Sequence, residues 1–82
     1  MGAEDLDAVF LPTLRAATEP LTTDELCARC GDADAAAGVG EWLSSAFVRG
    51  LVHTRRRERP LRIALTRRGL RAARRAGQRP AS

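Results

Sequence analysis

The spacing of the apolar residues changes at Gly50, and this change constrains the fold more than any other feature of the sequence. Before Gly50 the apolar residues recur at intervals of three and four, which is the period of an amphipathic helix. Two short runs, Leu51–Thr54 and Leu61–Leu65, are then typical of strands, and the second alternates as a half-buried strand does. A helical pattern returns after Thr66. The sequence therefore predicts a mainly α fold with a small β-hairpin.

The first expected helix contains a proline. Its apolar stripe consists of Leu6, Val9, Phe10, Leu14 and Ala17. Pro12 lacks the N–H that a helix interior uses and clashes with the preceding turn, so we expect a kink or a restart near Leu11. Glu19 precedes Pro20, and the residue before a proline is disfavoured in a helix. The helix is therefore expected to end there.

Capping residues mark the second helix. Thr22 and Glu25 have the spacing of a capping box, in which each side chain satisfies a backbone N–H of the other residue. This pattern predicts a short helix from about Thr23 to Cys30. Gly31 is expected to supply the left-handed residue that ends it.

The third expected helix spans about residues 34–49. Asp32 or Asp34 can cap its start. Gly38 and Gly40 weaken its first turns by up to about 1 kcal/mol each, so it is expected to fray or begin late. Its inward-facing positions are Val39, Leu43, Ala46 and Phe47.

The end of the sequence is dominated by arginine. The connection between the two expected strands, residues 55–60, contains four arginines. Thr66 is expected to cap a last helix from Arg67 to about Ala76, with Leu70 and Ala73 facing inward. The sequence contains no internal repeat and no linker. We therefore interpret residues 1–76 as one domain and residues 77–82 as a disordered tail.

Charge is distributed unevenly between the two halves. Residues 1–41 contain nine acids and two arginines, whereas residues 42–82 contain twelve arginines and Glu58 as the only acid. Such asymmetry indicates a nucleic-acid or membrane partner. A membrane partner is not expected, because no apolar run approaches the roughly 20 residues that span a bilayer. The acidic N-terminus and the presence of only two cysteines favour a cytoplasmic protein.

No enzymatic motif is present, and the chain is expected not to be an enzyme. Cys27 and Cys30 form a C-x-x-C pattern, but zinc needs four ligands and His53 is the only histidine, so no metal or cofactor is expected. The two cysteines are interpreted as small core residues, with a redox-sensing role as the alternative. Trp42 either completes the core or packs against a partner.

Three segments, in this order, resemble a winged helix-turn-helix domain of the bacterial MarR-, ArsR- and PadR-type transcription regulators. They are the run LTTDEL at 21–26, the apolar positions of the third helix followed by Gly-Leu-Val at 50–52, and the run LTRRG at 65–69. The resemblance covers roughly residues 6–76. It implies the element order α-α-α-β-β-α, a recognition helix at about 34–49 and an arginine-rich wing at 55–62.

The resemblance also implies a function. A winged-helix transcription regulator binds double-stranded DNA, and a homodimer would double its contacts. Phosphate or minor-groove contacts would come from the wing and the following helix, and base contacts from the recognition helix. The DNA-binding residues expected on this basis are Arg55, Arg56, Arg57, Arg59, Arg62, Arg67, Arg68, Glu41, Ser44 and Ser45.

Two further partners stay open at this point. The exposed start of the third helix has no Arg, Lys, Asn or Gln, the residues that usually read base edges. A winged-helix adaptor that binds another protein is therefore the alternative, and the arginine run would equally allow RNA.

Overall fold

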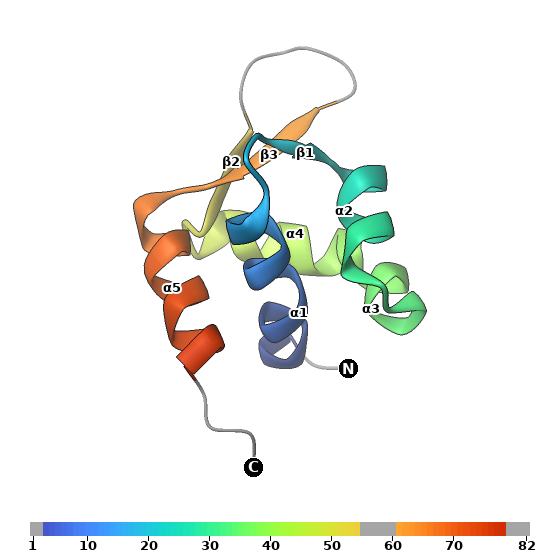
Figure 1. Ribbon diagram of the computed structural model, residues 1–82, viewed down its shortest axis with the longest axis horizontal. Helices are drawn as coiled ribbons and strands as arrows, with labels where there is room; N and C mark the ends of the chain where they lie inside the picture. The colour runs from blue at the N-terminus through green and yellow to red at the C-terminus, as the bar shows by residue number, and fades with distance from the viewer. Residues whose placement is uncertain (1–2, 55–60, 79–82) are drawn as a thin grey trace.

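Five helices and a three-stranded antiparallel sheet make up the part of the chain that the computed structural model describes, residues 3–54 and 61–78 (Figure 1). The elements follow one another as α1 (Ala3–Ala16), β1 (Leu21–Thr22), α2 (Thr23–Cys30), α3 (Ala33–Ala37), α4 (Val39–Val48), β2 (Val52–Thr54), β3 (Arg62–Leu65) and α5 (Arg67–Gln78). Figure 1 shows α1 between α5 on one side and α2 and α3 on the other. The mainly α character that the sequence predicts is confirmed.

The sheet has one strand more than the expected hairpin. Its strand order is β1-β3-β2, with Leu21 opposite Ile63 and Val52 opposite Leu65. The expected pair is present as β2 and β3, each one residue shorter at its start than predicted. β1 has only two residues, and it leads directly into the capping box of α2. A strand of two residues is too short to show the alternation of apolar and polar side chains by which strands are predicted from a sequence.

Helix α1 continues through Pro12, so the expected restart near Leu11 is wrong. Proline removes one backbone hydrogen bond, but the residues on both sides of it are held by packing: Phe10, Leu11 and Leu14 are all buried. The hydroxyl of Thr13 donates to the carbonyl of Val9 at 2.8 Å within the same helix. Tertiary burial therefore outweighs the local preference for a break.

The segment expected as one helix over 34–49 forms two helices, α3 and α4, which is a correction. Asp32 caps α3 by accepting hydrogen bonds from the N–H groups of Asp34 and Ala35. The chain leaves helical geometry at Gly38, whose N–H donates to the Ala35 carbonyl at 3.0 Å. A Cβ on Gly38 would lie 3.1 Å from the Leu6 side chain, so α1 packs closely against this break.

The predicted caps of α2 are confirmed. The hydroxyl of Thr22 accepts from the N–H of Glu25 at 3.1 Å, and the carboxylate of Glu25 accepts from the N–H of Thr22 at 3.0 Å. Gly31 ends the helix with φ 67°, the left-handed conformation that glycine adopts without strain.

The core is formed mainly where α1, α4 and the sheet meet. Trp42 is 1% exposed and lies against Phe10, with 4.9 Å between the ring centroids. Of the two roles left open for Trp42, the core position is the one observed. Phe47 and Leu70, which the sequence places inward, are instead exposed by 43% and 44%. Ala73 faces inward as predicted, and the buried residues of α4 are Trp42 and Ala46.

The start of α5 is fixed to the turn after α4. Thr66 caps α5 as predicted: its hydroxyl accepts from the N–H of Gly69 at 3.0 Å and donates to the Gly50 carbonyl. A Cβ on Gly69 would lie 1.9 Å from the Leu51 carbonyl oxygen, so only glycine permits this approach. The helix includes residues 77 and 78, which were expected in the tail, and the rest of that tail lies outside the described residues.

Candidate functional site

The arginine-rich connection is only partly described by the structure. Four of the expected DNA-binding residues lie outside the described residues: Arg55, Arg56, Arg57 and Arg59. Arg62 is exposed on β3, and its guanidinium Nη1 lies 3.8 Å from Oε1 of Glu25 and 3.5 Å from the Pro20 carbonyl. Arg62 therefore lies above the junction of β1 and α2.

Glu25 is held in its charged form at this junction. The backbone N–H of Thr22 and then its hydroxyl lower the pKa of Glu25, with a smaller contribution from Arg62 and a partial opposition from burial. The capping box thus carries a negative charge under Arg62.

Helix α5 presents a row of arginines to solvent. All of them are exposed: Arg67, Arg68, Arg71, Arg74 and Arg75. At about 100° per residue, their positions fall within roughly one third of the helix circumference. The opposite side carries Gly69 and Ala73, which are buried. We call this row the α5 arginine row. Arg67 and Arg68 are among the expected DNA-binding residues, and the other three arginines continue the row along the same side of the helix.

The outer face of α4 has a different chemistry. Glu41 and Ser44 are both exposed there, as the sequence predicts for base-contacting residues. Phe47 and Val48 are also exposed, Val48 by 88%. Ser45 lies at the edge of this face: it is half-buried, and its hydroxyl accepts from Nε of Arg49 at 3.0 Å. The described outer face of α4 therefore combines one acid, one hydroxyl and two apolar side chains.

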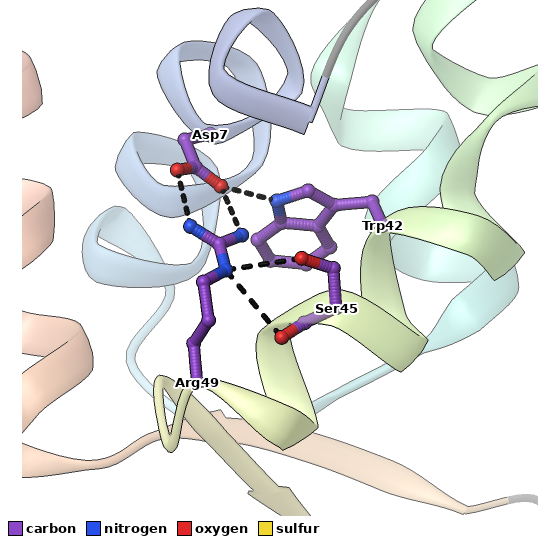
Figure 2. A network of polar contacts seen from close by, with 4 residues as sticks. All are labelled: Asp7, Trp42, Ser45 and Arg49. Carbon is purple, nitrogen blue, oxygen red and sulfur yellow. Dashed lines mark hydrogen bonds and ion pairs between the residues drawn. The ribbon is translucent and has the colours of Figure 1, made fainter.

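A polar network joins α1 to α4 (Figure 2). Oδ1 of Asp7 accepts from the indole N–H of Trp42 and from Nη2 of Arg49, both at 2.7 Å. Oδ2 of Asp7 accepts from Nη1 of Arg49, also at 2.7 Å. Sequence reasoning missed this network, because its members are 35 and 42 residues apart and no local spacing relates them.

A cleft of about 490 Å³ opens beside this network, between α1 and α5. It is lined by residues of α1 and α5 together with the end of α4 and the turn that follows it. The charged lining consists of Asp7, Arg49, Arg68, Arg71 and Arg75, and the apolar lining of Ala8, Leu11, Leu51, Ala72 and Ala76. Arg67 and Arg74, on the same helix, do not line it.

The cysteines are half-buried and free. Cys30 packs against the core and Cys27 is not part of that cluster, so the interpretation of both as small core residues is only partly met. Sγ of Cys30 donates to the Cys27 carbonyl at 3.1 Å. Burial raises the pKa of the Cys27 thiol, and Cys30 and Asp24 raise it further. A raised pKa lowers the thiolate fraction that a redox sensor needs.

Metal-binding clusters and membrane-spanning helices are absent from the described ranges. No group of three or more His, Cys, Asp or Glu side chains there is arranged to hold a metal ion. His53 is exposed on β2. None of the helices described combines the length and the apolar content that crossing a bilayer requires.

Comparison of the chain with protein-family models, with curated proteins and with solved structures found no match.

Proposed function

We propose that the chain is a small winged-helix protein that binds double-stranded DNA, as the DNA-binding part of a transcription regulator does. The observation that carries the proposal is the α5 arginine row, which is exposed and contains no acid. Arginine forks pair with phosphate oxygens through two parallel hydrogen bonds. The order of the elements supports the same proposal, because the β2–β3 hairpin follows the helices and precedes a last helix, as the winged-helix resemblance implies.

The binding we propose depends mainly on phosphate contacts. The outer face of α4 offers Glu41 and Ser44 as polar groups, with none of the arginine, asparagine or glutamine side chains that usually read bases. Phosphate contacts position a protein on a duplex without reading its sequence. We therefore expect measurable affinity for random duplex DNA and only a small preference among sequences.

Fluorescence anisotropy with a labelled random duplex tests this proposal. Neutralising roughly four to six phosphates predicts a log–log slope of affinity against salt of about −4 to −5. The double variant Arg67→Gln, Arg74→Gln should reduce the slope by about two, because each arginine is expected to contact one phosphate. The matched control is Arg15→Gln, Arg29→Gln, which removes two exposed arginines from the acidic half. Affinity that does not change with salt would contradict the proposal.

A second candidate function is supported by the outer face of α4. Phe47 and Val48 are exposed beside Glu41, a combination better suited to a protein partner than to a DNA groove. The double variant Phe47→Ser, Val48→Ser distinguishes the two functions. If α4 enters a DNA groove, the substitution lowers DNA affinity. If α4 is a protein-binding face on an adaptor, DNA affinity stays unchanged.

A further inference from the structure

We propose that the cleft between α1 and α5 binds a small molecule that carries two or more phosphate groups on a compact apolar body. The cleft shares Arg68, Arg71 and Arg75 with the α5 arginine row, but the inference does not rest on DNA binding. It follows from the shape of the cleft, from the charge of its lining and from the positions of the arginines that do not enter it.

The shape of the cleft is set by small residues. Ala8 on α1 and Ala72 and Ala76 on α5 line it, where longer apolar side chains would fill the space between the two helices. Leu11 and Leu51 add an apolar lining. A volume of about 490 Å³ lies within the range of small-molecule sites, which combine an apolar lining with a few convergent polar groups.

The charge of the lining is strongly positive. Four arginines and one aspartate give a formal balance of three positive charges. The oxygens of that aspartate, Asp7, already accept hydrogen bonds from Trp42 and Arg49. None of the ion pairs found among the described residues involves Arg68, Arg71 or Arg75. Arg68 also donates from Nη1 to the Arg49 carbonyl at 3.3 Å. Its other N–H groups, together with the guanidinium groups of Arg71 and Arg75, are therefore available to a ligand.

The spacing of the arginines directs them to a common ligand. Arg68, Arg71 and Arg75 follow one another at intervals of three and four, which places them along one side of α5. Two phosphate monoesters carry roughly three to four negative charges, close to the balance of the lining. The alanines and leucines of the lining match an apolar body between or beside those phosphates.

Pyrophosphate, ADP and adenosine separate the contribution of the phosphates from that of the uncharged body that carries them. Isothermal titration of the full chain should show saturable binding of pyrophosphate, tighter binding of ADP and no binding of adenosine. Trp42 fluorescence provides a second readout, because the Trp42 indole shares Asp7 with the cleft lining. Binding of adenosine as tight as that of ADP, or no saturable binding of either phosphate compound, would overturn the proposal.

Matched variants on α5 separate a built site from general charge attraction. The double variant Arg71→Gln, Arg75→Gln should weaken ADP binding by about tenfold or more, because it removes charged hydrogen bonds. The control Arg67→Gln, Arg74→Gln removes the same charge from the same helix outside the cleft, and we expect a change below about twofold, through long-range screened attraction alone. Equal losses of ADP affinity in the two double variants would contradict a binding site in the cleft.

A third variant tests the shape of the cleft with its charge intact. Ala72→Leu places a larger side chain in the cleft and should weaken ADP binding by about tenfold, since it takes the space of the apolar body. Circular dichroism and the thermal midpoint establish that each variant is folded. Unchanged ADP affinity in folded Ala72→Leu would contradict a ligand seated between the helices. Duplex-DNA anisotropy is measured separately, so loss of one activity is distinguishable from loss of the other.

Discussion

Asp7 links two parts of the chain that lie far apart in the sequence, α1 and the end of α4. It accepts from Trp42 and from both terminal nitrogens of Arg49, and its side chain is 20% exposed. Removing it leaves the indole N–H of a buried tryptophan and a half-buried guanidinium without this acceptor. Such groups cost free energy when they are left unsatisfied.

Asp7→Ala should therefore lower the free energy of unfolding by about 2–3 kcal/mol, a value reduced from the fully buried case because the pair is partly exposed. Urea denaturation followed by Trp42 fluorescence measures this change. The control Asp34→Ala, at an exposed aspartate, should change stability by less than about 0.5–1 kcal/mol. A change in Asp7→Ala no larger than in the control would show that the network does not stabilise the fold.

Gly69 and Gly40 form a matched pair of helical glycines with opposite expected outcomes. A Cβ at position 69 meets the Leu51 carbonyl at 1.9 Å, whereas a Cβ at position 40 meets nothing within 4 Å. Gly69→Ala should destabilise the protein by about 3 kcal/mol or more, because backbone has to move. Gly40→Ala should stabilise it by roughly 0.5–1 kcal/mol, the usual gain from replacing a helical glycine. Thermal midpoints of the two variants measure both changes. A stabilised Gly69→Ala would show that the start of α5 and the backbone at Leu51 can move apart at little cost in free energy.

The residues that the sequence did and did not predict differ in the range of their interactions. The Thr22–Glu25 capping box, the Gly31 cap and the Thr66 cap are local, and their spacing shows them. The link from Asp7 to Arg49 depends on how α1 and α4 pack, which no local pattern contains. The same limit applies to Phe47 and Leu70, because which side of a short helix faces inward depends on neighbouring elements.

At the scale of elements, the capping box of α2 also makes stability depend on pH. The folded pKa of Glu25 is lowered, chiefly by the Thr22 backbone N–H, so its contribution is present above the ordinary pKa of 4.5 and is lost as pH falls through the lowered value. Glu25→Gln removes this contribution. The stability difference between the native chain and Glu25→Gln should therefore be larger at pH 7 than at pH 3.

Urea denaturation at the two pH values measures this difference. Glu19→Gln is the control, since Glu19 is exposed and precedes the proline that separates α1 from β1. A difference for Glu25→Gln that is the same at both pH values would show that the carboxylate does not act through its charge.

The elements themselves were predictable to different extents. Helices with a cap and a clear apolar period, such as α2 and α5, were predicted close to their observed bounds. The glycines at 38 and 40 weaken the third helix, and the structure divides it at Gly38, where Leu6 of α1 packs close to the glycine. No local pattern in the sequence shows which of the two glycines lies at the break. The cleft between α1 and α5 was not predicted, because alanine in a helix indicates close packing as readily as it indicates a hollow.

At the scale of the whole molecule, the α5 arginine row is unfavourable for folding. Arginines three and four positions apart on one helix repel each other, and Arg67 lies in the first turn, where the helix dipole disfavours a positive charge. No acid in α5 compensates for this repulsion. A row that costs stability and is nevertheless exposed is consistent with an anionic partner.

Arg67→Glu tests this argument, because stability and binding should change in opposite directions. The new carboxylate would lie in the first turn and four residues before Arg71, so the free energy of unfolding should rise by roughly 0.5–1 kcal/mol at low salt. Duplex-DNA affinity should fall, since one phosphate contact becomes a repulsion. Arg67→Gln is the control that removes the charge without reversing it, and both changes should then be about half as large. If Arg67→Glu is more stable and binds DNA as well as the native chain does, the arginine row is a solvated surface and not a phosphate-binding one.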